Sequence, residues 1–130
     1  MKDTPQDEKS TVELAAVTID CQDPVPMIAF YQAMADGQIT RYFKDGGANI
    51  TIGTTSVNIR HVEDFKAPTW PSPDVPMQIH FEFYIDDLQQ AEARLQRIGA
   101  TTAGHQPHNQ PGLLVMLDPA GHPFCIGTRV

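Results

Sequence analysis

The chain has 130 residues, of which 41% are hydrophobic, and a formal net charge of −7 from 9 basic and 16 acidic side chains. This length suits one domain with a single hydrophobic core, and no apolar run approaches the ~20 residues of a membrane-spanning helix. The acidic balance, without a basic cluster, argues against a nucleic acid or an anionic membrane as partner.

The N-terminus is polar and has no apolar signal core. We therefore expect residues 1–11 to form a disordered tail and the protein to be cytoplasmic. Cys21 and Cys125 are the two cysteines, and no Cys-x-x-Cys pair occurs. This usage predicts free, buried thiols and not a disulfide framework.

The first regular segment covers residues 13–21 and reads as a strand with Val17, Ile19 and Cys21 on its dry face. Asp23 can then cap a helix that has Pro24 at its first position and ends at Gly37. The apolar stripe of this helix is predicted to contain Ile28, Tyr31 and Met34 or Ala35, and the β-like runs that follow it are residues 39–43, 48–52 and 57–62.

Residues 67–76 contain four prolines. Proline lacks the backbone N–H that a central strand or helix needs, so this segment is predicted to be a stiff, extended linker.

The next segment, residues 77–87, alternates apolar and polar side chains, as a strand with one dry and one open face must. The predicted dry face holds Met77, Ile79, Phe81, Phe83 and Ile85, and the open face holds Gln78, His80, Glu82 and Tyr84. A helix over residues 88–98 follows, with Asp87 as its cap, Gln90 completing a capping box, and Gly99 at the C′ position. The later β-like runs are residues 101–103, 113–117 and 123–127, and the turn Asp118–Gly121 joins the last two.

The chain repeats itself. Asp87 lies 64 residues after Asp23, and superimposing these two caps aligns the apolar positions of the flanking strands and helices. We therefore predict an α+β domain over residues 12–130 that is built from two βαβββ modules. Module one covers 12–66, the linker covers 67–76, and module two covers 77–130.

Paired modules with these motifs resemble the vicinal-oxygen-chelate superfamily, which includes glyoxalase I, extradiol dioxygenases, bleomycin resistance proteins and fosfomycin-modifying enzymes. Its small glyoxalase-like domains are the subgroup that the chain resembles most. The residues that carry the resemblance are 16–24, 28–31, 60–65, 68–71, 79–88, 99–101 and 118–124. It implies that the modules form a cupped, mostly antiparallel sheet with the helices on its convex side. It also implies a homodimer.

The resemblance places the metal-ligand positions of the superfamily at Ala16, Arg60, His80 and Cys125. Alanine has no donor atom, and a guanidinium carries its own positive charge. His80 and Cys125 alone fall short of the three protein ligands typical of catalytic zinc. We therefore expect no cofactor. The alternative is a divalent metal ion held with the help of Glu82, of His61 after a one-residue slip, or of the loop histidines His105 and His108.

Without a metal the cup still holds a chemically distinct set of ligand-binding candidates. Arg60 can grip a carboxylate or a phosphate, His80 can act as general acid or base with Glu82 orienting it, and Trp70 can form a flat apolar wall. Tyr84 and Cys125 complete the set. Each candidate also has a structural interpretation, such as an ion pair between Arg60 and Glu82, or a Trp70 that fills the gap between the modules.

These residues support three functions. The first is the binding of a small organic molecule in the cup without the usual catalytic metal set. The second is a metal-dependent lyase, isomerase or dioxygenase of the glyoxalase type that uses His80. The third is metal-free acid–base catalysis by His80. Glyoxalase I activity itself is not expected, because the family's ligand set is incomplete.

Overall fold

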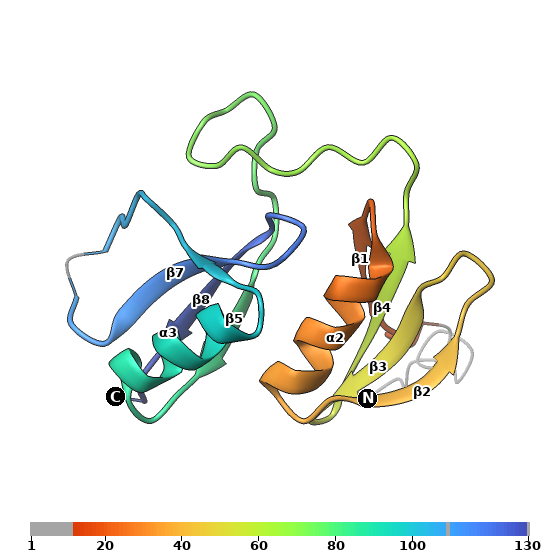
Figure 1. Ribbon diagram of the computed structural model, residues 1–130, viewed down its shortest axis with the longest axis horizontal. Helices are drawn as coiled ribbons and strands as arrows, with labels where there is room; N and C mark the ends of the chain where they lie inside the picture. The colour runs from red at the N-terminus through yellow and green to blue at the C-terminus, as the bar shows by residue number, and fades with distance from the viewer. Residues whose placement is uncertain (1–11, 109, 130) are drawn as a thin grey trace, which may run out of the picture.

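The computed structural model describes residues 12–108 and 110–129, so the predicted disordered tail over residues 1–11 lies outside the described residues. Module one contains β1 (Val17–Cys21), α2 (Pro24–Met34), β2 (Gln38–Tyr42), β3 (Ala48–Ile52) and β4 (Thr55–His61). Module two contains β5 (Phe81–Tyr84), α3 (Leu88–Arg97), β6 (Thr101–Thr102), β7 (Leu113–Leu117) and β8 (Pro123–Gly127). Figure 1 shows the two modules side by side.

Each module forms its own open four-stranded sheet with the same topology. The strand orders are β1-β4-β3-β2 and β5-β8-β7-β6. β1 runs parallel to β4 and β5 parallel to β8, whereas the other neighbouring strands are antiparallel. Helices α2 and α3 lie on the same side of the two sheets (Figure 1). The predicted α+β class and the repeated βαβββ plan are confirmed.

Both helices begin where the sequence predicts. The Asp23 side chain accepts a hydrogen bond from the backbone N–H of Val25 at 3.1 Å, and Asp87 accepts one from Gln90 at 2.9 Å. These bonds satisfy donors that the first helical turn leaves without an intrahelical partner. Arg94 of α3 in turn donates to backbone carbonyls at the end of α2. The helices of the two modules are thus directly connected.

The two modules share one hydrophobic core. Side chains of α2, such as Phe30, pack with Ile50 and Ile59 of module one and with Phe124 and Met116 of module two in a single buried cluster. The rings of Phe30 and Phe124 lie 5.9 Å apart. Because this core crosses the module boundary, the modules hold a fixed relation at the site described below.

Strand β5 is shorter than predicted. Its pairing with β8 begins at Phe81 opposite Phe124, one residue after Pro123 opens β8. The preceding residues have no strand to pair with, and the prediction that Ile79 faces the core is wrong, because this side chain is 76% exposed. From Phe81 onward the predicted alternation is confirmed: Phe81 and Phe83 pack against the core, and Tyr84 is exposed.

The linker is folded back on itself and is not the extended crossing that its prolines predicted. The backbone N–H of Thr69 donates to the Val75 carbonyl at 2.7 Å, and the Val75 N–H donates to the Thr69 hydroxyl at 2.8 Å. Residues between the prolines supply the donors that proline lacks, and these close a compact loop.

Among the described residues, no helix has the length and apolar character required to cross a membrane.

Candidate functional site

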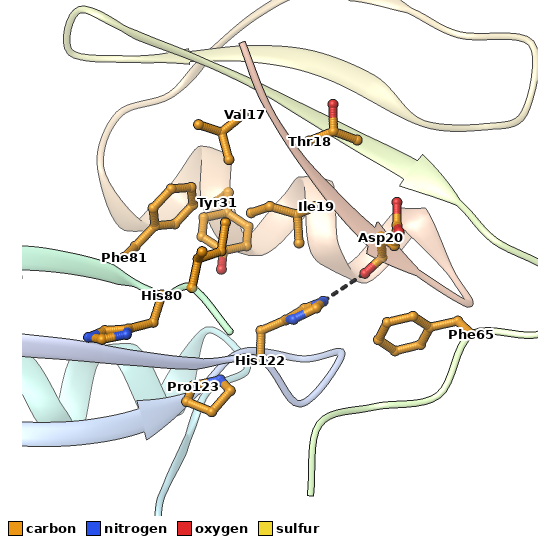
Figure 2. Close-up of a pocket in the computed structure, with 11 residues that line it drawn as sticks. Val17, Thr18, Ile19, Asp20, Tyr31, Phe65, His80, Phe81, His122 and Pro123 are labelled. Atoms are coloured by element: carbon orange, nitrogen blue, oxygen red, sulfur yellow. Dashed lines mark hydrogen bonds between the residues drawn. The ribbon is translucent and has the colours of Figure 1, made fainter. Parts of the chain in front are cut away.

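A pocket of about 380 Å³ opens between the two modules. Its walls come from β1, from Tyr31 of α2, from the segment that enters β5 and from the start of β8 (Figure 2). The lining residues are Val17, Thr18, Ile19, Asp20, Tyr31, Phe65, Ile79, His80, Phe81, His122 and Pro123. Aliphatic and aromatic side chains make up most of this lining, with two histidines and the polar residues of β1 among them. The pocket therefore suits a small organic molecule with a polar end.

A buried hydrogen bond lies behind this pocket and joins the modules. The Tyr31 hydroxyl of α2 donates to Oδ2 of Asp118 at 2.6 Å. Oδ1 of the same carboxylate accepts from the backbone N–H groups of Ala120 and His122, which shapes the turn before β8. Burial raises the pKa of the Asp118 carboxyl, although its hydrogen bonds act in the opposite direction. Burial beside this carboxylate also raises the pKa of Tyr31 well above its usual value, so the phenol stays protonated.

His122 bridges from module two to the edge of β1. Its Nε2 lies 2.7 Å from the backbone oxygen of Asp20 (Figure 2). On another side, the ring of Phe65 lies 5.4 Å from the His122 ring, at an interplanar angle of 49°. These two contacts fix the imidazole in the pocket wall.

His80 lines the same pocket with a side chain that is 32% exposed. Its Nε2 lies 3.6 Å from Oε2 of Glu82, whose side chain is largely exposed. This distance exceeds that of a hydrogen bond, so the two predicted residues are neighbours without a fixed hydrogen-bonded geometry. His80 is the one predicted site residue that lines this pocket.

Arg60 does not line this pocket. Its Nε donates to Oδ2 of Asp45 at 2.8 Å, and its guanidinium lies 4.2 Å from the centre of the Phe43 ring. The hydrogen bond from Arg60 is the main cause of the lowered pKa of Asp45. Arg60 therefore forms an ion pair with Asp45 and not with Glu82, the partner that the structural interpretation of the sequence offered.

Trp70 and Cys125 meet on the open face of the second sheet. Trp70 packs against the small buried cluster of Ala103, Val115 and Cys125, and its ring lies 5.4 Å from that of His105. Burial, together with the charge of Glu82, raises the pKa of Cys125. The thiol thus stays protonated near neutral pH, as expected of a buried free cysteine.

Tyr84 lines a separate hollow of about 300 Å³ on the second sheet, together with Glu82 and Cys125. Its side chain is 65% exposed, and the guanidinium of Arg129 lies 4.1 Å from its ring centre. The predicted set is thus divided among three places. His80 lines the pocket between the modules, Arg60 pairs with Asp45, and Glu82, Tyr84 and Cys125 line the hollow on the second sheet, where Trp70 packs against the cluster that contains Cys125.

The four residues that the resemblance predicts at the metal-ligand positions do not form a set that fits a metal ion. Ala16 has no donor atom, and the Arg60 cation is already paired with Asp45. His80 and Cys125 remain, which is fewer than the three protein ligands typical of catalytic zinc. Within residues 12–108 and 110–129, no three side chains of His, Cys, Asp or Glu are grouped as a metal site would require.

Three residues at or beside the pocket, Tyr31, Asp118 and His122, were not predicted as site residues. Tyr31 was predicted as part of an apolar stripe, although a buried tyrosine hydroxyl normally needs a partner. Asp118 was predicted only as a turn residue, and His122 follows that same turn. The signal that could have linked them was chemical: a buried phenol in one module requires an acceptor, and the turn of the other module supplies a carboxylate.

Comparison with known proteins places the chain in a family. The family model described as the glyoxalase-like domain matches residues 16–127. No curated protein matches the chain.

Solved structures share the fold at low identity. A variant of the fosfomycin resistance protein FosX from Listeria monocytogenes, complexed with Mn(II) and 1S,2S-dihydroxypropylphosphonic acid, is 16% identical with a TM-score of 0.70, over 91% of this chain and 90% of that chain. FosX from Mesorhizobium loti is 19% identical with a TM-score of 0.65, over 91% of this chain and 92% of that chain. A glyoxalase/bleomycin resistance protein from Albidiferax ferrireducens is 16% identical with a TM-score of 0.62, over 90% of this chain and 98% of that chain. The chain therefore belongs to the glyoxalase-like domain family, within the vicinal-oxygen-chelate superfamily.

Proposed function

We propose that this protein binds a small, mainly apolar organic molecule in the pocket between its two modules. The observation that carries this proposal is the pocket itself, about 380 Å³ in volume and lined mostly by aliphatic and aromatic side chains. Ligand sites of proteins combine such a lining with a few polar groups and have volumes of roughly 300–1,000 Å³.

The exposure of Ile79 supports the proposal. This large aliphatic side chain is 76% exposed and lines the pocket together with Phe81 and residues of β1. Exposed apolar area costs free energy in water, and a ligand that covers Ile79 would remove this cost.

We further propose that binding needs no metal ion. The FosX structure holds Mn(II) together with a phosphonic acid. In this chain, two of the four ligand positions predicted from the resemblance are occupied by Ala16 and Arg60. Metal analysis by mass spectrometry, on untagged protein incubated with manganese, zinc, nickel and iron(II), tests this directly. We expect the protein to hold less than about a tenth of an equivalent of metal tightly, because it offers fewer ligands than a catalytic zinc site requires. One equivalent that is lost in His80→Ala would contradict the metal-free account.

The pocket itself is tested with a variant that blocks it. Ile79→Trp adds bulk at the pocket margin, and the exposed position of Ile79 leaves the core intact. Val25→Trp is the matched control, because Val25 is also largely exposed and does not line the pocket.

A fragment library is screened by ligand-observed NMR against the wild type and both variants. We expect fragments that bind the wild type and Val25→Trp but not Ile79→Trp. No binding to the wild type, or equal binding to all three proteins, would overturn the proposal.

A further inference from the structure

We propose that His122 determines which ligands the pocket accepts, by taking a hydrogen bond at Nδ1 from a hydroxyl or N–H donor of the ligand. This inference rests on the proposed function and adds the ligand class: a neutral donor group, such as a phenol or an alcohol, on an apolar body.

The tautomer of His122 follows from its partner. Nε2 lies 2.7 Å from the backbone oxygen of Asp20, and a carbonyl oxygen can only accept a hydrogen bond. Nε2 must therefore carry the proton and donate it. In the neutral ring the other nitrogen, Nδ1, then has a free lone pair and can only accept.

Nδ1 is available to a ligand. Within the described part of the chain, the hydrogen bond of the His122 ring is the one through Nε2. The ring lies in the wall of the pocket, between Ile19 and Pro123 in the view of Figure 2. A donor on a bound molecule would thus supply a hydrogen-bond partner to Nδ1.

The imidazole is also held in place before a ligand arrives. The ring of Phe65 packs beside the His122 ring, and the backbone N–H of His122 donates to Oδ1 of Asp118 at 3.0 Å. An acceptor that is already oriented loses little conformational entropy on binding, which favours recognition by hydrogen bonding.

The other polar groups of the pocket are engaged, exposed, or not held in one orientation. His80 belongs to the last kind, because among the described residues no hydrogen bond orients its ring and its Nε2 lies 3.6 Å from Glu82. The Tyr31 hydroxyl donates to Asp118, and the Thr18 hydroxyl accepts from Asn58 at 3.3 Å. The side chain of Asp20 belongs to an exposed residue of β1. His122 is therefore the polar group best placed to select among apolar ligands.

The test compares two probes that differ by one group, p-cresol and p-xylene, in which a methyl replaces the hydroxyl. Their dissociation constants are measured by NMR titration for the wild type, His122→Ala and His61→Ala. His61 is the matched control, because its Nδ1 also lies 2.7 Å from a backbone oxygen, that of Gln22, and it does not line the pocket.

The quantity that decides is the ratio of the p-xylene to the p-cresol dissociation constant. We expect His122→Ala to lower this ratio about fivefold, the effect of one net hydrogen bond, and His61→Ala to leave it unchanged. An unchanged ratio in a folded His122→Ala protein that binds both probes would overturn the role of His122 and leave the proposed function standing. Binding of neither probe to the wild type would count against the proposed function itself.

A second measurement needs no variant. Nitrogen NMR of the histidine side chains in the wild type should show the Nε2–H tautomer for His122 and a shift of its Nδ1 resonance on adding p-cresol but not p-xylene. The Nδ1–H tautomer, or an equal response to both probes, would overturn the inference.

Discussion

At the scale of single residues, the hydrogen bond between Tyr31 and Asp118 is the contact that most directly couples the modules at the pocket. Both side chains are buried, and the bond spans 87 residues of sequence at 2.6 Å. A buried carboxylate that loses a donor is left with an unmet desolvation cost. The pair therefore has measurable consequences for stability and for its pH dependence.

Removing the hydroxyl in Tyr31→Phe should lower the free energy of unfolding by about 1–3 kcal/mol, because Oδ2 of Asp118 loses its donor without a replacement. Urea denaturation measures this change. Tyr42→Phe is the control, since Tyr42 is 70% exposed and should change stability by less than about 0.5 kcal/mol. Equal effects of the two substitutions would show that the buried bond contributes nothing specific.

The raised pKa of Asp118 predicts how stability depends on pH. The folded protein binds the proton of this carboxyl more tightly than the unfolded chain, whose carboxyl has the usual pKa of 3.8. The contribution of Asp118 to stability is therefore complete below pH 3.8 and is lost as the pH rises through the folded pKa.

Asp118→Asn lacks this titration, while the other carboxyl groups stay the same. We expect the free energy of unfolding of Asp118→Asn, relative to that of the wild type, to rise as the pH increases above 3.8 and through the raised pKa of Asp118 in the folded protein. Urea denaturation at several pH values measures this difference. A constant difference, or one that falls with pH, would contradict the raised pKa of Asp118.

At the scale of elements, sequence periodicity predicted well which face of a strand is buried and where a helix starts. Alternation in residues 81–84 and the caps Asp23 and Asp87 are local features, and a local pattern is enough to specify them. The prediction from the same alternation was wrong at Ile79, because the length of a strand depends on where its partner strand begins. The prediction of an extended linker was also wrong, because it too overlooked contacts between separated residues. Two hydrogen bonds join Thr69 to Val75 across the intervening prolines.

Neighbouring residues of β5 test the assignment of its faces. Phe83→Ala should cost about 3 kcal/mol, the lower end of the range for a large core truncation, because Phe83 packs against the core but is only partly buried. Tyr84→Ala should cost less than about 1 kcal/mol, since the exposed ring loses mainly its contact with Arg129. Chemical denaturation measures the loss of unfolding free energy in both variants. A larger loss for Tyr84→Ala would show that the buried and exposed faces of β5 are assigned the wrong way round.

At the scale of the whole molecule, the shared core predicts cooperative unfolding. Phe30 of module one and Phe124 of module two belong to one buried cluster, so neither module keeps its core when the other unfolds. We expect urea transitions followed by Trp70 fluorescence and by far-ultraviolet circular dichroism to coincide. Trp70 lies on the second sheet, and an earlier or later fluorescence transition would show that the modules unfold separately.

The sequence identified the fold more completely than the site. The repeat, the caps and the family motifs are properties of contiguous segments, and they predicted two βαβββ modules. The pocket depends instead on how the modules meet. It brings His122 to the backbone of Asp20, across 102 residues, and Tyr31 to Asp118. Neither of these two long-range contacts produces a periodic pattern in the sequence. Arg60, which was predicted from the resemblance, instead donates to the nearby Asp45.

Isoleucine methyl groups report most directly on whether a small organic molecule binds between the modules. Ile19 and Ile79 line the pocket, whereas Ile52 and Ile126 line other surface hollows. Methyl NMR spectra of isoleucine-labelled protein, recorded with and without p-cresol, measure all four at once. We expect shifts of Ile19 and Ile79 and none of Ile52 or Ile126. Shifts confined to Ile52 or Ile126, or no shift at all, would contradict it.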